Sequence, residues 1–192
     1  MEALSDEQVG SYQRDGFVLL EGAFPRTLAL RCRDLLWDQL DEDRDDPSTW
    51  SRPVVRIGSQ TDPAFEEAAC SPRWVEAIHQ VAGPLADPTP WMGGTFAVRF
   101  PVEGDPGDDG WHIEGSWTGP DGWYWVNRRS RDRALLMLVL FSDIGDDDAP
   151  TRIRVGSHVD LPDVLAPHDG TEPRFIAQPG VPWTPGVDGF PT

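Results

Sequence analysis

The fold expected of this chain is decided by the stretch Trp111-His112-Ile113-Glu114-Gly115-Ser116-Trp117. It places an imidazole and a carboxylate two residues apart, between bulky apolar side chains. On a β-strand this spacing puts both groups on the same face. Two such groups inside a barrel would be the fixed half of a two-histidine, one-carboxylate triad, which holds non-haem Fe(II) and leaves coordination positions open. A His-x-Glu pair alone is a weak signal because most such pairs are chance occurrences on a surface. The interpretation therefore depends on the rest of the chain.

The composition predicts one acidic domain. The chain has 192 residues, of which 39% are hydrophobic, and this is enough for a single core. We expect one domain over 1–192, with a helical N-terminal part over 1–90 and core strands over 91–192. The net charge of −17 disfavours nucleic acid and anionic membranes as partners. No apolar run approaches the roughly 18 residues of a membrane span, and no basic region followed by an apolar run opens the chain. A soluble, cytoplasmic protein is expected.

Helix signals concentrate in the first half of the chain. Ser5-Asp6-Glu7-Gln8 has the form of a capping box and predicts a helix over about 6–14. Prolines at helix-start positions predict further helices after Pro25, over 63–69 and over 72–81. The acidic run 41–46 lacks the glycine and the alternating ligands of a calcium loop, so we expect a solvated linker there. The two cysteines, Cys32 and Cys70, are too few for a disulfide scaffold and are expected to be reduced and buried.

Strand signals follow in the second half. Residues 95–101 and 151–155 have the period of a strand, and the second run ends at the Gly-Ser-His turn 156–158. The uninterrupted apolar run 134–141 predicts a central strand that is covered on both faces.

Together these features resemble the phytanoyl-CoA dioxygenase family of Fe(II)- and 2-oxoglutarate-dependent oxygenases. The resemblance covers most of the chain, and it is carried by residues 12–20, 111–114, 134–143, 149–158 and Pro173-Arg174-Phe175. It implies a mainly β, α+β fold, namely a double-stranded β-helix, or jelly roll, with N-terminal helices packed on one sheet.

The resemblance also assigns roles to individual residues. It makes His112 and Glu114 two of the iron ligands, with Glu where the family more often has Asp. It makes Arg174 the partner of the far carboxylate of 2-oxoglutarate, a role that suits a bidentate guanidinium. In the family, a strand with a distal histidine ligand lies between the Gly-Ser-His turn and this arginine. Here only 15 residues separate His158 from Arg174, so that strand is missing from a shortened C-terminal part.

The resemblance therefore leaves three candidates for the third iron ligand, namely His168, His158 and water. Counting back from Arg174 by the family's spacing leads to Asp163, which is not a histidine. His168 is our preferred candidate because it lies before Arg174 on the same segment, between turn residues. The alternatives are His158 in the Gly-Ser-His turn and water.

Three functions follow from these alternatives. The first is an Fe(II)- and 2-oxoglutarate-dependent dioxygenase that acts with O2 on a small-molecule substrate. The second is a non-catalytic or metal-impaired family member that binds a ligand, and the short C-terminal part favours it. The third is a cupin-type metal-dependent isomerase or epimerase, because a fold does not decide a function, although this chain offers few histidines for such a site.

The substrate and the oligomeric state stay open at this point. An apolar pocket is suggested by four aromatic residues, Trp117, Trp123, Tyr124 and Trp125, and an acidic substrate by four arginines, Arg128, Arg129, Arg131 and Arg133. Both sets also have ordinary explanations, since tryptophans pack loops and arginines offset nearby acids.

Overall fold

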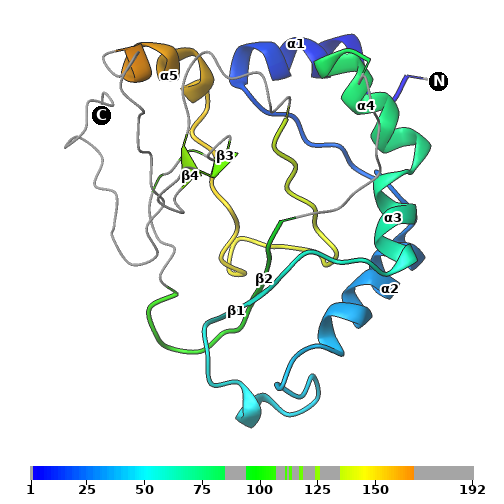
Figure 1. The fold of residues 1–192 in the computed structure, drawn as a ribbon, viewed down its shortest axis with the longest axis vertical. Helices are drawn as coiled ribbons and strands as arrows, with labels where there is room; N and C mark the ends of the chain where they lie inside the picture. Colours follow the sequence, from blue (N-terminus) through cyan, green and yellow to red (C-terminus); the bar gives the residue numbers. More distant parts are fainter. Residues whose placement is uncertain are drawn as a thin grey trace. The chain divides into compact units, whose positions relative to one another are not determined.

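The computed structural model describes residues 2–84, 94–106, 111, 113, 117–118, 124–125 and 135–166. The chain divides into two compact units. Unit 1 comprises residues 1–105 and 138–153, and unit 2 comprises residues 106–137 and 154–192. Figure 1 labels the elements of both units in chain order.

The first two helices of unit 1 confirm the expected start signals. Helix α1, Asp6–Asp15, begins with a complete capping box in which Ser5 and Gln8 each bond the other's backbone N–H. It ends at Gly16, whose φ of 86° is a left-handed conformation that glycine adopts without a steric penalty. Helix α2, Arg26–Trp37, follows Pro25 and buries Leu28, Cys32 and Leu36, which recur every fourth residue on one face.

The next two helices also begin where the sequence predicts. Helix α3, Pro63–Ala69, and helix α4, Pro72–Ala82, each have proline in the first turn, where its missing N–H costs nothing. Their N-cap side chains, Asp62 and Ser71, accept backbone N–H groups of the first turn. Helix α3 packs on α2, and α4 packs on α1, as Figure 1 shows.

A short sheet and three phenylalanines complete the main core of unit 1. Strands β1, Val54–Ile57, and β2, Phe96–Arg99, pair antiparallel with Ile57 opposite Phe96. The rings of Phe65, Phe96 and Phe141 contact one another, with centroids 5.5 to 6.1 Å apart. Phe65 is only 1% exposed. This core therefore joins α3, β2 and the segment that begins at residue 138.

A second, smaller core holds the start of the chain. Leu4 is 1% exposed and packs with Ala3 and Ala77. The side chain of Gln80 on α4 accepts the N–H groups of Ala3 and Leu4 and donates to the carbonyl of Leu4. Because these three bonds satisfy backbone groups that would otherwise be buried without partners, they fix the segment before α1 onto α4.

Unit 2 contains two short strands and one helix among its described residues. Strands β3, Trp117–Thr118, and β4, Tyr124–Trp125, pair antiparallel, with Trp117 opposite Trp125. Helix α5, Ser157–Leu165, follows Gly156, which has a left-handed φ of 77°, and it contains Pro162. None of the described helices in either unit is both long enough and apolar enough to cross a membrane.

The expected jelly roll is wrong. Among the described residues there are five α-helices, and the strands form two separate two-stranded pairs, β1–β2 and β3–β4. A double-stranded β-helix needs long strands that pair into two facing sheets, and the described strands have only two to four residues. The architecture is predominantly helical in these parts of the chain.

The main source of the error is the run 134–141. Its described residues form no strand pair, and its leucines at 136, 138 and 140 are 57%, 52% and 56% exposed. The alternating residues Leu135, Met137 and Val139 are half-buried. Residues 151–155, also expected as a strand, lie in no strand either. An apolar run signals burial, but it does not supply the neighbouring strand that a sheet requires.

Candidate functional site

The four residues that the sequence nominates for a metal and co-substrate site are His112, Glu114, His168 and Arg174. All four lie outside the described residues. On either side of His112, Trp111 and Ile113 are described, and both are half-buried. The segment leads into β3, so the nominated pair comes shortly before the Trp117–Trp125 backbone pairing.

The alternative third ligand lies on a helix. His158 is the second residue of α5 and is exposed. Asp163, which the family's spacing indicates for the distal ligand, lies on the same helix and is also exposed. The span 157–165 therefore has helical rather than strand geometry, and successive side chains point about 100° apart instead of alternating. In the described residues, no group of three or more His, Cys, Asp or Glu side chains is placed to hold a metal ion.

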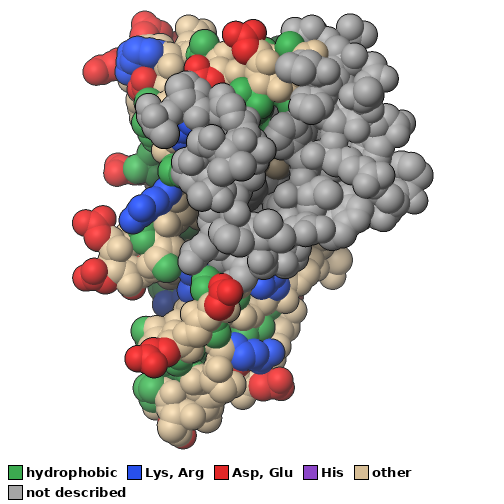
Figure 2. Space-filling view, turned by 90° about the vertical axis from the view of Figure 1, so that its left-hand side faces the viewer, with side chains coloured by type: hydrophobic (Ala, Val, Ile, Leu, Met, Phe, Trp, Pro, Cys, Tyr) green, Lys and Arg blue, Asp and Glu red, His purple; other side chains and the backbone are tan. Residues whose placement is uncertain are grey.

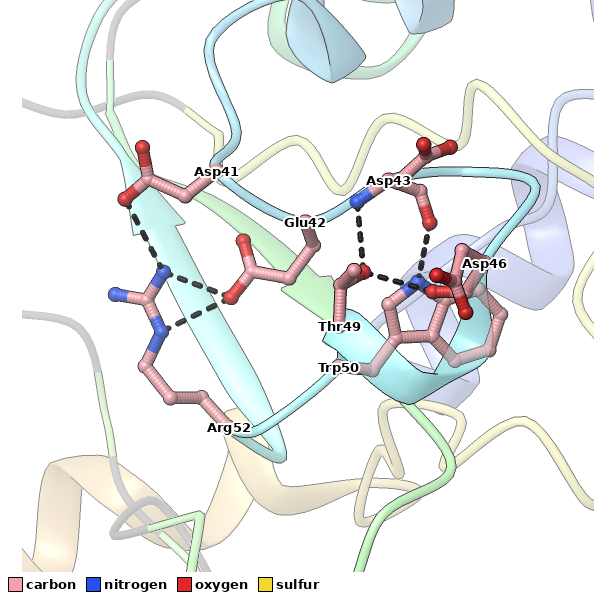
Figure 3. Close-up of polar contacts among 7 residues, drawn as sticks. All are labelled: Asp41, Glu42, Asp43, Asp46, Thr49, Trp50 and Arg52. Carbon is pink, nitrogen blue, oxygen red and sulfur yellow. Dashed lines mark hydrogen bonds and ion pairs between the residues drawn. The ribbon is translucent and has the colours of Figure 1, made fainter.

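The acidic run after α2 is more structured than a solvated linker. Glu42 is 5% exposed and is the only charged residue that is buried in the described parts of the chain. Arg52 donates to its Oε1 from Nε at 3.0 Å and from a terminal nitrogen at 2.7 Å. Figure 3 shows both bonds, with Asp41 reaching the same guanidinium at 4.0 Å. The prediction of a wholly solvated linker is thus wrong at Glu42.

Neighbouring bonds hold the rest of this loop. The N–H of Asp43 donates to Thr49 Oγ1 at 2.9 Å, and the indole N–H of Trp50 donates to the Asp43 carbonyl at 2.8 Å (Figure 3). A short 3-10 helix, Pro47–Thr49, is capped by Asp46. The ring of Trp50 contacts Phe100 at 5.4 Å. The contact between Trp50 and Phe100 holds the loop at the end of β2. The sequence contains one signal of this arrangement, namely that Trp50 and Arg52 follow the acidic run closely.

The second oxygen of Glu42 is the unusual feature of this ion pair. Oε2 is buried and has no hydrogen-bond partner. A buried carboxylate oxygen without a donor costs free energy that a hydrogen bond would normally recover. Both hydrogen bonds from Arg52 end on Oε1, and none reaches Oε2. The ion pair therefore offsets the charge of Glu42 but leaves one of its two oxygens without a donor.

Other ion pairs lie at the surface. Arg26 and Asp143 form two hydrogen bonds at 2.9 and 3.1 Å, and both side chains are largely exposed. These hydrogen bonds from Arg26, assisted by its charge, hold the pKa of Asp143 below its usual value. Hydrogen bonds from Arg44 and Arg33 lower the pKa of Asp34 in the same way.

Figure 2 shows one face of the molecule. On the described part of this face, acidic side chains are spread over the surface rather than gathered in one patch.

The two cysteines differ in their exposure to solvent. Cys32 is fully buried on α2 and Cys70 is exposed, and both are free thiols. Burial raises the pKa of the Cys32 thiol to about 11, because desolvation disfavours the thiolate. The expectation that both cysteines are buried is therefore wrong for Cys70, and the chemistry of Cys32 is that of an inert core residue.

Comparison with known proteins adds no assignment, since no family model, no curated protein and no solved structure matches this chain.

Proposed function

We propose that this protein is an Fe(II)- and 2-oxoglutarate-dependent dioxygenase that oxidises a small organic substrate with O2. The observation that carries the proposal is the His112-x-Glu114 pair, followed in the chain by His168 and Arg174. Two imidazoles and one carboxylate are the ligand types of non-haem Fe(II) oxygenases. The proposal rests on these residues and on the family resemblance.

Each residue has a distinct role in this proposal. His112, Glu114 and His168 would hold the metal, and Arg174 would bind the far carboxylate of 2-oxoglutarate through its two parallel N–H groups. Iron bound there would supply the activation of O2, coupled to oxidation of the co-substrate. The longer side chain of Glu114, compared with the aspartate more common in the family, would move the carboxylate outward by one methylene.

Trp111 and Ile113 are two residues apart and are both half-buried, as expected for one face of an extended segment at the edge of a core. In an extended conformation, the two-residue spacing of His112 and Glu114 would put both side chains on one face, as two ligands of one metal require. A cytoplasmic location for this activity is part of the proposal, and the acidic composition of the chain is compatible with it.

A second candidate is a ligand-binding protein without catalysis. Helix α5 favours it, because this helix occupies the position that the family's spacing would give to the distal ligand. With only His112 and Glu114 anchored, a divalent ion would be held by two protein groups and water, and its affinity would fall.

The test is anaerobic loading with Fe(II), followed by addition of O2 and 2-oxoglutarate and measurement of succinate. We expect succinate from the wild type and none above background from His112→Ala or Glu114→Ala. His79→Ala, on α4 in unit 1, is the matched control and should retain turnover. Metal binding without turnover in the wild type would favour the second candidate, and equal turnover in His112→Ala would overturn the proposed site.

A further inference from the structure

The second part of unit 1 is a segment that returns to it late in the chain. The first part ends at residue 105, and the second comprises residues 138–153, here called the return segment (yellow in Figure 1). Within the return segment, every residue except Val139 and Phe141 is exposed to solvent. Its apolar attachment to unit 1 therefore depends on one half-buried and one buried side chain.

Phe141 is the apolar anchor of the return segment. It is 8% exposed, and its ring centroid lies 5.7 Å from that of Phe24, 5.6 Å from that of Phe65 and 6.1 Å from that of Phe96. Phe24 precedes α2, Phe65 lies on α3 and Phe96 begins β2. Val139 packs against the same core. A single buried ring thus closes the core of unit 1 against three separate parts of the chain.

An ion pair holds the return segment two residues beyond this anchor. Arg26, the first residue of α2, donates one hydrogen bond to each carboxylate oxygen of Asp143, at 3.1 and 2.9 Å. The two side chains are 72% and 83% exposed, so water and salt screen the attraction between their charges. The ion pair is therefore a small, salt-sensitive addition to the apolar anchor.

The helices that contribute to the same core are attached to it more extensively. Helices α2 and α3 each bury three side chains and have the internal backbone hydrogen bonds of a helix. Local opening of a folded protein begins in segments with few buried apolar contacts. With one buried side chain, the return segment has the smallest attachment of these three parts of unit 1.

We propose that the return segment is a strap that releases reversibly from unit 1 while α2 and α3 stay folded. Phe141 is its anchor, and the ion pair between Arg26 and Asp143 is its clasp. Release uncovers the rings of Phe24, Phe65 and Phe96. Burial of the anchor opposes release, whereas salt and the loss of either charge of the clasp favour it.

Thiol labelling distinguishes release of the strap from opening of the helices. In a Cys70→Ser protein the remaining natural thiol is Cys32, which is 0% exposed on α2 and reports on the helices. Phe141→Cys adds a thiol at the anchor. With an aromatic disulfide reagent, and with peptide mapping to assign the labelled site, the new thiol should react at least about tenfold faster than Cys32 in the folded protein. Circular dichroism checks that each variant is folded.

A second variant keeps the anchor in place and tests the clasp. Val139→Cys, also in the Cys70→Ser protein, adds a thiol at a half-buried position of the strap. Arg26→Gln should raise its labelling rate about two- to fivefold, and about 1 M sodium chloride should have a similar effect. Arg14→Gln is the matched control, because it removes an ion pair with Asp15 on α1 and should leave the rate unchanged. Neither substitution should change the rate at Cys32.

Two results would overturn the proposal. If the thiol introduced by Phe141→Cys and the thiol of Cys32 react at equal rates in a folded protein, unit 1 opens as a whole and the strap does not release by itself. If Arg26→Gln and Arg14→Gln have the same effect on the labelling of Val139→Cys, the ion pair with Asp143 is not a clasp.

Discussion

Arg52 donates both of its hydrogen bonds with Glu42 to a single carboxylate oxygen, at 2.7 and 3.0 Å, while the other oxygen is buried without a partner. The side chain of Glu42 is 2% exposed and that of Arg52 is 51% exposed. The free-energy cost of desolvation therefore arises mainly from Glu42. Water also screens part of its attraction to Arg52, because the guanidinium is half-exposed. The pair joins the acidic loop after α2 to Arg52, which lies two residues before strand β1 begins.

Removal of Arg52 should destabilise unit 1 more than removal of an exposed arginine. Arg52→Ala leaves the charge of Glu42 buried and unpaired, so we expect a loss of about 2 kcal/mol in the free energy of unfolding, less than for a fully buried pair. Arg31→Ala is the control, since Arg31 is 3.7 Å from Asp62 with both side chains partly exposed, and it should cost less than about 0.5 kcal/mol. Urea denaturation measures both, and equal losses would contradict the account.

A double variant separates the effect of the unpaired charge of Glu42 from the loss of the Arg52 side chain. Glu42→Leu with Arg52→Ala removes both the buried charge and its partner, so the double variant should be more stable than Arg52→Ala alone. A double variant less stable than Arg52→Ala would show that Glu42 stabilises the loop without Arg52.

Ser71 should contribute more than an ordinary N-cap. Its hydroxyl accepts the N–H of Trp74 and donates to the carbonyl of Ala23, and the residue is 8% exposed. Ser71→Ala should cost about 2 kcal/mol because it removes a cap and leaves the partly buried carbonyl of Ala23 without its donor. Ser5→Ala at the exposed capping box of α1 should cost about 1 kcal/mol. Thermal denaturation of both variants makes the comparison, and a smaller loss for Ser71→Ala would contradict it.

Several local features could be predicted from the sequence because their causes are local. The capping box at Ser5 and Gln8 and the prolines at the starts of α3 and α4 act within one helical turn, and these helices begin at the predicted residues. Strand β2 lies within the run 95–101 for the same reason, since its alternating pattern is visible in the sequence.

The sheet arrangement could not be predicted in the same way. The run 134–141 has the composition of a buried central strand, yet only one side of its described residues contacts a core. Pairing between strands depends on residues far apart in the sequence, and a composition signal does not specify the partner. Glu42 illustrates the same limit, because its burial depends on Arg52 and on the loop through Trp50, while its local sequence is that of a solvated acidic run.

The two cysteines should react with thiol reagents at very different rates. The Cys32 thiol is buried and has a pKa of about 11, whereas Cys70 is exposed. At pH 8 we expect one thiol per chain to react with an aromatic disulfide reagent, and the Cys70→Ser variant to react only after unfolding. Rapid labelling of Cys32 in folded Cys70→Ser would contradict its burial.

The same pKa predicts the effect of pH on stability. Because the folded pKa of Cys32 exceeds its unfolded value near 9, the contribution of the neutral thiol is complete below pH 9 and is lost as the pH rises towards 11. Comparison with Cys32→Ala isolates this contribution: the unfolding free energy of the wild type should fall more steeply between pH 9 and 11. Parallel slopes would show that the thiol does not contribute.

Arg174 provides an independent test of the proposed co-substrate. Arg174→Ala should weaken binding of 2-oxoglutarate to the Mn(II)-loaded protein by about 2 kcal/mol, because it removes a bidentate partner of a carboxylate. Arg152→Ala, at an exposed arginine outside the proposed site, should leave binding unchanged. Titration calorimetry that gives equal affinities for wild type and Arg174→Ala would remove Arg174 from the site.

The most direct measurement is the metal content of the protein after anaerobic dialysis against Fe(II) or Mn(II). We expect one tightly held ion per chain in the wild type and in His79→Ala. Marked loss of that ion is expected in His112→Ala and in Glu114→Ala, because each substitution removes a ligand that water replaces poorly. His168→Ala should weaken binding to a smaller extent if His168 is the third ligand. Equal metal content in wild type and His112→Ala, or no bound metal in the wild type, would contradict the proposed function.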